Sequence, residues 1–136
     1  MLELFRGKDA DMVIVVQAVA DVSRYGSVAL DHDGRITRFL EKGIRGGPGL
    51  INAGVYLLRK QIVRDLPAGT AISLEREVFP RFLDRGVYGL VCTGLFIDIG
   101  IPDGLKQAQT LLASRVGTAS HDSCAPLSPK VPGDTT

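Results

Sequence analysis

The chain has 136 residues, of which 45% are hydrophobic and 23% are charged, and its formal net charge at pH 7 is +1. This length suits one domain with one hydrophobic core, and the near-neutral charge argues against a nucleic-acid-binding protein or a basic membrane-binding surface. The longest apolar runs, such as 12–20, are too short to span a bilayer, and the charges scattered over 1–11 do not fit a signal peptide.

The chain begins with a segment, 2–9, that has the pattern of a helix end. The next segment, 11–19, is β-branched and continuously apolar, which predicts a strand buried on both faces of a sheet. The segments 25–31 and 35–42 alternate in polarity and are predicted to form a hairpin. The sequence DHDG joins them, with Gly34 able to adopt a positive φ in the turn.

Helices and strands continue to alternate after the hairpin. We predict a strand at 50–60, followed by a short helix at 60–66 that stops before a proline. A longer helix is predicted from Ser73, which can cap its start, to Gly86, which can end it. This order of elements favours an α/β fold, and the hairpin makes the sheet at least partly antiparallel.

The last part of the fold is predicted to contain two short strands, 87–94 and 95–100, and a helix at 101–115 with a proline in its first turn. From about Val116 the composition changes to Ser, Thr and Pro with few large apolar residues. We therefore predict an α/β domain over 1–115 and a disordered tail over 116–136.

The two cysteines stand in different surroundings, since Cys92 lies in an apolar run and Cys124 in the polar tail. We expect a buried thiol and an exposed thiol rather than a disulfide, which indicates a reducing cytoplasm. The two histidines, His32 and His121, are isolated, so no zinc site is predicted.

The charged pair Glu41 and Lys42 ends the predicted hairpin. Lys42 can offer a compact positive charge to a phosphate, and Glu41 can accept hydrogen bonds from hydroxyl groups. A solvated strand end would explain the same two residues without any ligand. The glycine-rich loop that follows does not match a phosphate-binding loop, because a strand rather than a helix comes after it.

Asn52 and Gly54 are unusual residues for a strand interior. An Asn side chain can donate to and accept from a sugar hydroxyl, and a glycine allows a ligand to approach the backbone closely. Alternation places both residues on one face with Tyr56. A β-bulge is the plain alternative.

Asp98 is flanked by apolar residues in a predicted strand. A buried carboxylate needs a cation or several hydrogen bonds, and Mg²⁺ is one such partner; capping of the following helix is the alternative. Glu75 stands in the first turn of the helix that begins at Ser73, where a purely structural role is expected from its favourable interaction with the helix dipole.

Taken in order, the segments RYGSVALDHDGRITRFLEKG, LINAGVYLL, SLEREVFP and FIDIGIPDGLKQA resemble the sugar-1-phosphate nucleotidylyltransferases. These enzymes make a nucleoside-diphosphate sugar and pyrophosphate from a nucleoside triphosphate and a sugar 1-phosphate. The residue sequences of the predicted strands are most similar to those of the guanylyltransferases that act on heptose or mannose 1-phosphate. The resemblance runs from about Asp11 to Leu112.

The resemblance implies a role for particular residues. Glu41 and Lys42 match the pair that binds the sugar hydroxyls and the sugar phosphate, and Asp98 matches one of two aspartates that hold a catalytic Mg²⁺. The remaining implied sugar-contacting positions are Gly26, Asn52 and Gly54. The implied reaction is in-line attack by the sugar phosphate on the α-phosphate, without a covalent nucleophile.

The resemblance also implies a fold and its partners. The fold is a partial Rossmann-like α/β fold with a mixed sheet and flanking helices. The family's glycine-rich nucleotide loop and second metal-binding aspartate are expected on a preceding half that these residues do not include. We therefore expect sugar 1-phosphate as a ligand, and nucleoside triphosphate and Mg²⁺ only with that other half. A homo-oligomer or a complementing chain is a further possible partner, and the chain alone is expected to be inactive. A non-catalytic sugar-phosphate-binding module and a degraded remnant are the alternatives.

Overall fold

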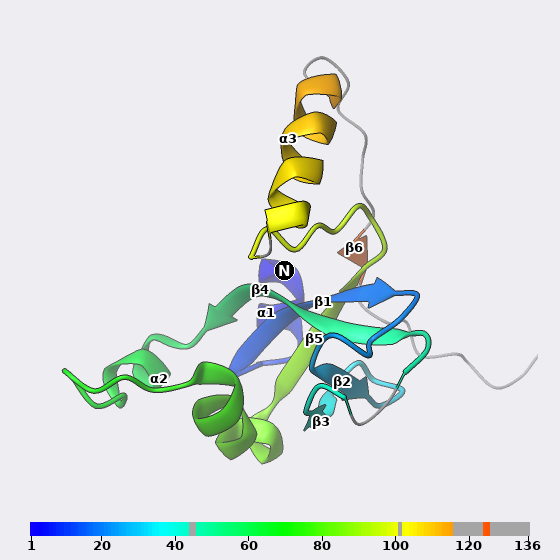
Figure 1. The fold of residues 1–136 in the computed structure, drawn as a ribbon. Coiled ribbons are helices and arrows are strands. Elements are labelled where there is room, and N and C mark those ends of the chain that lie inside the picture. The colour runs from blue at the N-terminus through cyan, green and yellow to red at the C-terminus, as the bar shows by residue number, and fades with distance from the viewer. Residues whose placement is uncertain (44–45, 101, 116–123, 126–136) are drawn as a thin grey trace, which may run out of the picture.

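The structure is a computed structural model, and it describes residues 1–43, 46–100, 102–115 and 124–125. The described strands form one mixed sheet in the order β3-β2-β4-β1-β5-β6, and the chain also forms helices, of which α2 and α3 extend away from the sheet (Figure 1), which confirms the predicted α/β class. In chain order the elements are α1 (Leu2–Gly7), β1 (Met12–Val19), β2 (Ser27–Leu30), β3 (Ile36–Leu40), β4 (Gly49–Leu58), α2 (Lys60–Arg64), the π-helical turn η1 (Leu74–Val78), the 3₁₀ helix η2 (Phe79–Arg85), β5 (Val87–Cys92), α3 (Pro102–Arg115) and β6 (Cys124–Ala125).

Strand β1 lies at the centre of the sheet, where it pairs parallel with β5 and antiparallel with β4. Its side chains alternate between two apolar clusters, because successive residues of a strand point to opposite faces. Met12, Ile14 and Val16 belong to the larger cluster, whereas Val13 joins the smaller one. The prediction of a strand buried on both faces is therefore confirmed.

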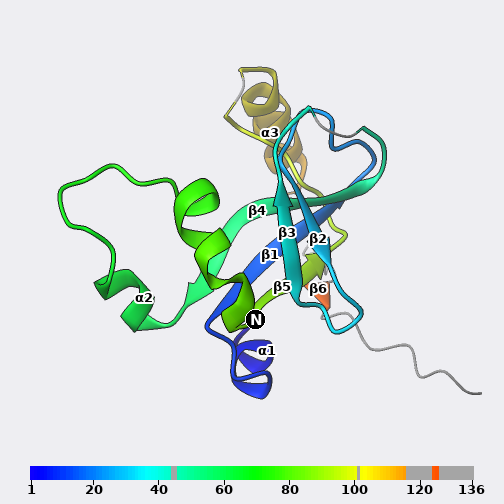
Figure 2. The ribbon, with the colours of Figure 1, turned by 90° about the horizontal axis from the view of Figure 1, so that it is seen from below.

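The larger cluster is closed by the segment η1–η2, which lies against one face of the sheet beside β3 (Figure 2). Phe79 is fully buried there. Its ring centroid lies 4.9 Å from that of Tyr56 and 5.9 Å from that of Phe39. One aromatic side chain thus joins the helical segment to both β4 and β3.

The predicted hairpin is present as β2 and β3. Gly34 has a φ of 79° in the connecting turn. The carboxylate of Asp31 accepts hydrogen bonds from the backbone N–H groups of Asp33 and Arg35, both at 2.9 Å. This side chain satisfies backbone donors that the turn leaves without strand partners.

The helix predicted from Ser73 to Gly86 begins and ends as expected, but it is not a regular α-helix. Ser73 Oγ accepts a hydrogen bond from Arg76 N, and Gly86 ends the segment with a φ of 93°. In between, the π-helical turn gives way to a 3₁₀ helix near Pro80. Proline lacks an N–H and its ring clashes with the carbonyl four residues earlier, so a continuous α-helix is disfavoured there.

The strand predicted at 95–100 is wrong. Residues 95–98 have no strand partner within the described part of the chain, and Asp98 is half-buried in a loop. The buried side chain of Gln17 donates a hydrogen bond of 2.9 Å to the carbonyl of Gly94. This bond holds the backbone just after the end of β5, where the chain leaves the sheet.

The prediction of two separate thiols is also wrong, because Cys92 and Cys124 form a disulfide. β6 pairs antiparallel with the end of β5, and this register places the two cysteines directly opposite each other. Two strand residues within a polar segment are too short a pattern to recognise in the sequence. The expectation of a reducing compartment loses the support it drew from separate thiols. The rest of the predicted tail, 116–123 and 126–136, lies outside the described residues.

Within the described residues, no helix combines the length and the apolar character needed to cross a membrane.

Candidate functional site

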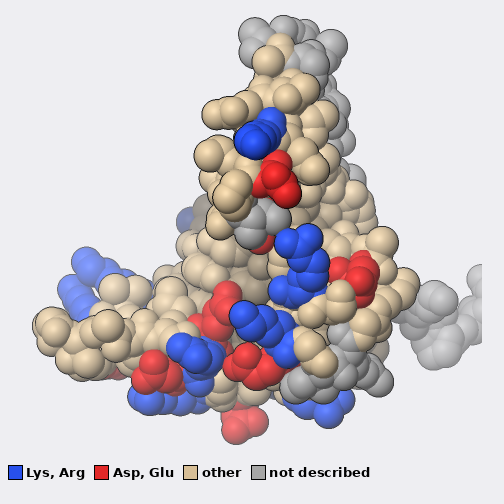
Figure 3. All heavy atoms as spheres, in the orientation of Figure 1, with Lys and Arg blue, Asp and Glu red and all other residues tan. Residues whose placement is uncertain are grey.

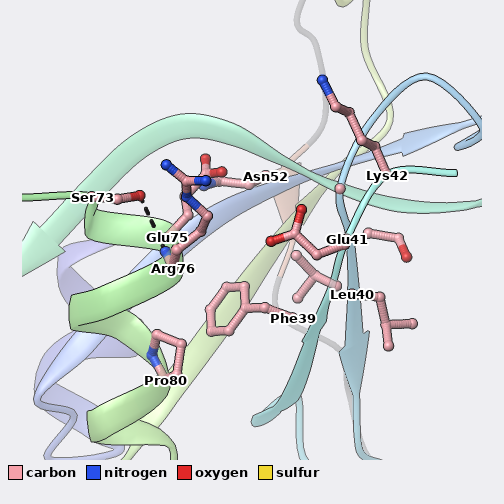
Figure 4. A pocket seen from close by; sticks show the side chains of 12 residues that line it. Phe39, Leu40, Glu41, Lys42, Asn52, Ser73, Glu75, Arg76 and Pro80 are labelled. Atoms are coloured by element: carbon pink, nitrogen blue, oxygen red, sulfur yellow. Dashed lines mark hydrogen bonds between the residues drawn. The ribbon is translucent and has the colours of Figure 1, made fainter. Parts of the chain in front are cut away.

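A pocket of about 460 Å³ opens between the end of the β2–β3 hairpin, β4 and the turn η1 (Figure 4). Its walls are polar and its floor is apolar. The lining residues are Gly26, Ser27, Val28, Phe39, Leu40, Glu41, Lys42, Asn52, Ser73, Glu75, Arg76 and Pro80.

The register of the sheet brings two of the polar walls together. Ser27 of β2 pairs with Leu40 of β3 on one side and with Ile51 of β4 on the other. The residues that follow the end of β3, Glu41 and Lys42, therefore lie across the hairpin from Asn52 of β4. The turn η1 supplies the opposite wall, and Phe79 anchors that wall to the sheet.

Four of the six residues predicted from the sequence line this pocket, namely Gly26, Glu41, Lys42 and Asn52. Gly54 and Asp98 do not. A Cβ atom added to Gly26 would lie 3.2 Å from the carbonyl oxygen of Leu40, so close backbone packing by itself accounts for a glycine there.

Gly54 lies in an irregularity of β4, which agrees with the bulge alternative. In the pairing of β1 with β4, Ile14 is opposite Tyr56 and Val16 is opposite Asn52, so one residue of β1 faces three of β4. Gly54 has a φ of 77° within this bulge. Glycine is the residue that adopts this conformation at little cost.

Asn52 is the centre of a hydrogen-bonded group in the pocket wall. Its Nδ2 donates to Tyr56 Oη at 2.8 Å and to Glu75 Oε1 at 2.7 Å. Its Oδ1 accepts from the backbone N–H of Gly54 at 2.9 Å. Burial raises the pKa of Tyr56, and the charge of Glu75 adds to this, while the hydrogen bond from Asn52 acts against it.

Glu75 and Arg76 line the pocket, whereas the sequence predicts only a structural role for Glu75. The signal that could have identified them is the repeated order of charges, Glu-Lys at 41–42 and Glu-Arg at 75–76. Figure 4 shows the side chain of Glu41 directed into the pocket from the hairpin, with Glu75 on the opposite wall beside Asn52. Glu75 also lies in the first turn of η1, as expected, and Glu77 of the same turn accepts a hydrogen bond from Ser73 N at 2.9 Å through its Oε1.

The charged groups of the pocket are accessible to a ligand. Within the described part of the chain, the side chains of Glu41, Lys42 and Arg76 make no hydrogen bond or ion pair, and all three are exposed. The wider surface in the same region mixes both signs of charge (Figure 3). Two carboxylates and two cations at one pocket can bind hydroxyl groups and a phosphate at the same time.

Asp98 offers a single carboxylate to a metal ion. Its Oδ1 accepts a hydrogen bond of 2.9 Å from Gly100 N in the turn before α3. Among the described residues, no group of three or more His, Cys, Asp and Glu side chains could hold a metal. Asp98 therefore fits Mg²⁺ only as one ligand of an ion that takes its other ligands from phosphates, water or further carboxylates.

The pocket's chemistry agrees with the comparison of the chain with protein families. The nucleotidyl transferase family model matches residues 1–115. The chain belongs to this family. The match includes both polar walls of the pocket and the loop that holds Asp98.

Two similar proteins of this family are both guanylyltransferases. The chain is 34% identical over 106 residues to a mannose-1-phosphate guanylyltransferase of Mycobacterium tuberculosis, an alignment that covers 76% of this chain and 30% of that protein. It is 36% identical over 101 residues to a D-glycero-alpha-D-manno-heptose 1-phosphate guanylyltransferase of Aneurinibacillus thermoaerophilus, which covers 74% of this chain and 43% of that protein.

Solved structures agree with the fold. HddC of Yersinia pseudotuberculosis matches with a TM-score of 0.66 and 38% identity, over 79% of this chain and 46% of that chain. The same protein has also been solved in complex with GMP-PN. A thymidylyltransferase-like protein of Bacillus anthracis, at 19% identity and a TM-score of 0.67, supports the fold alone. The chain thus spans at most half the length of these relatives.

Proposed function

We propose that this chain forms the sugar-1-phosphate-binding part of a nucleotidylyltransferase that transfers a guanylyl group to mannose or heptose 1-phosphate. The observation that carries the proposal is the convergence of the free Glu41 and Lys42 side chains with the turn η1 at one pocket. The names of the relatives support the class of substrate. Because the chain spans less than half of them, nucleotidyl transfer by the whole protein is part of the proposal.

The proposed roles follow from the chemistry of the side chains. The ammonium group of Lys42 binds the phosphate of the sugar 1-phosphate, and the carboxylate of Glu41 accepts hydrogen bonds from sugar hydroxyls. Asp98 is the described residue proposed to hold Mg²⁺, which would supply positive charge to the reacting phosphates. Holding the phosphate oxygen in one orientation is the main task of this chain's own residues. We place this reaction in the cytoplasm.

Isothermal titration of the 136-residue chain with mannose 1-phosphate, heptose 1-phosphate and inorganic phosphate tests the binding role. We expect both sugar phosphates to bind more tightly than inorganic phosphate. Lys42→Ala should weaken the binding of all three ligands. Lys60→Ala is the matched control, because Lys60 is an exposed lysine of α2 outside the pocket. Absence of sugar-phosphate binding, or equal weakening by the two lysine variants, would contradict the proposal.

The transfer role is tested by mixing the chain with the nucleotide-binding half of the Aneurinibacillus relative, GTP, Mg²⁺ and the sugar phosphates. Pyrophosphate release that depends on this chain supports transfer. Sugar-phosphate binding without any pyrophosphate release would favour a non-catalytic binding module.

A further inference from the structure

The hydrogen-bonding capacity of Asn52 is already used within the pocket wall. A side-chain amide has two N–H donors and one carbonyl oxygen. Both donors are occupied, by Tyr56 Oη and Glu75 Oε1, and the oxygen accepts from Gly54 N. The opposite orientation of the amide would face its oxygen toward the Glu75 carboxylate and its NH₂ group toward the Gly54 N–H, so the network fixes the assignment. No N–H of Asn52 remains for a ligand.

Glu75, in contrast, keeps a free oxygen. Its Oε1 accepts from Asn52, while its Oε2 makes no hydrogen bond within the described part of the chain. The residue is exposed and stands on the pocket wall opposite Glu41, beside Asn52 (Figure 4). A ligand between the two walls would therefore meet an acceptor on each side.

The position of Glu75 depends on its partner on the sheet. The turn η1 has five residues. An isolated helical segment of this length is not stable by itself. Asn52 links this turn to β4, and Asn52 is in turn fixed by the bulge at Gly54 and by Tyr56, whose ring packs on the buried Phe79. A chain of contacts thus runs from the core to the Glu75 carboxylate.

We propose that Glu75 binds the sugar hydroxyls on this wall and that Asn52 is a positioning residue that acts through it. This inference rests on the proposed function and names the groups that recognise the sugar rather than the phosphate. With Glu41 opposite, the pocket selects a ligand that presents hydroxyl groups in two directions. Bare phosphate has no hydroxyl-bearing ring for these two carboxylates to recognise.

A double-mutant cycle separates positioning from direct contact. We expect Glu75→Ala to weaken the binding of mannose 1-phosphate roughly tenfold, which is the order expected for the loss of a hydrogen bond to a charged group. Asn52→Ala should weaken it by a smaller factor, and the double variant should bind no more weakly than Glu75→Ala alone. If the two losses multiply in the double variant, Asn52 contacts the ligand independently and the inference is overturned.

Two further comparisons make the result specific. Glu75→Gln and Glu77→Gln form a matched pair on the same turn. Only Glu75→Gln should weaken the binding of mannose 1-phosphate, and the circular dichroism spectrum should be unchanged in both variants. Inorganic phosphate should bind all these variants like the parent chain. If the parent binds mannose 1-phosphate and Lys42→Ala weakens it while Glu75→Ala does not, this inference fails and the proposed function stands. If the parent does not bind, the proposed function fails first.

Discussion

The pocket beside η1 and the loop after β5 both carry acidic side chains at the edge of an apolar core, but their scaffolds differ. In the pocket, Glu41 and Asn52 are placed by the register of paired strands, and Glu75 is tied to the same sheet through Asn52. Asp98 lies six residues beyond the end of β5, in a loop held by local bonds. Strand pairing makes side chains from separate segments converge, whereas a loop leaves its carboxylate alone.

The same contrast appears in what stabilises each region. The pocket rests on the main core through Phe79, while the segment after β5 is held by the Gln17 hydrogen bond and the Cys92–Cys124 disulfide. Changes in one region should therefore leave the other largely unaffected, because distant sites without shared partners behave additively.

The largest effect is expected for Phe79→Ala. This substitution removes a fully buried aromatic side chain that packs on Phe39 and Tyr56, and it should lower the free energy of unfolding by about 3–5 kcal/mol. Urea denaturation measures the loss. Sugar-phosphate binding should weaken as well, because η1 loses its anchor. A variant that keeps full affinity would show that the pocket does not depend on this core.

Reduction of the disulfide should have the next largest effect. A bond between residues separated by 32 positions typically contributes about 2–4 kcal/mol through the restriction of the unfolded chain. Thermal unfolding with and without a dithiol reductant measures the change, and a Cys124→Ser variant, which should not respond to reductant, is the control. The affinity for mannose 1-phosphate should change by no more than about twofold in the reduced protein, since neither cysteine lines the pocket.

Lys42→Ala should change binding without changing stability. The side chain is exposed and has no partner among the described residues, so the free energy of unfolding should move by less than about 0.5 kcal/mol. Affinity for a sugar phosphate should fall roughly tenfold, because a charged hydrogen bond is lost. Unfolding and titration on the same sample compare the two quantities, and a large loss of stability would contradict the solvated position of Lys42.

Asp98→Ala should have a modest effect on the isolated chain. Because Asp98 is half-buried and accepts the Gly100 N–H, the substitution should destabilise the fold by about 0.5–1.5 kcal/mol. A deeply buried, unpaired carboxylate would have given the opposite sign. Chemical denaturation decides between the two signs. Affinity for the sugar phosphate in the absence of metal should be unchanged.

The smallest effect is expected for the pH dependence of the stability that Asp21 contributes. The side-chain hydrogen bond from Ser23, with the backbone N–H groups of Ser23 and Gly47, lowers the pKa of Asp21 below its ordinary value. A lowered folded-state pKa means that this contribution is fully present above the unfolded pKa and is lost as the pH falls through the folded one. Unfolding of the parent and Asp21→Asn should therefore differ at neutral pH and converge in acid. A difference that does not shrink as the pH falls below the ordinary carboxyl pKa would contradict this assignment.

The sequence was sufficient for the elements whose pattern is local. The apolar run of β1, the DHDG turn with Gly34 and the helix stop at Gly86 each depend on neighbouring residues only. Asn52 stands out from the residues alone, because an amide is disfavoured in an apolar strand, whereas Glu41 and Lys42 could be chosen only through the family resemblance, since a solvated strand end explains them equally well. Their meeting at one pocket agrees with that choice, while their roles in binding stay predictions.

The parts that could not be predicted depend on distant contacts. Apolar residues at 95–99 indicate a strand, but a strand needs a neighbour, and the chain leaves the sheet at Gly94. The disulfide depends on a two-residue pairing that no pattern reveals. The place of Glu75 depends on the fold of η1 against β4, so its position in the first helical turn could not distinguish a capping group from a pocket wall.

The disulfide also determines how the sheet ends. β3 closes one side of the sheet as a short strand with the exposed Thr37 and Arg38, features that discourage pairing with another chain. On the other side, the start of β5 is covered by the Gly34 carbonyl, which accepts from Gly89 N at 2.8 Å, and among the described residues its end is covered by β6 alone. Because β6 has only two residues, breaking the covalent link should free this cover and expose backbone donors and acceptors of β5. We therefore expect the reduced protein to self-associate through this side of the sheet more readily than the oxidised protein does.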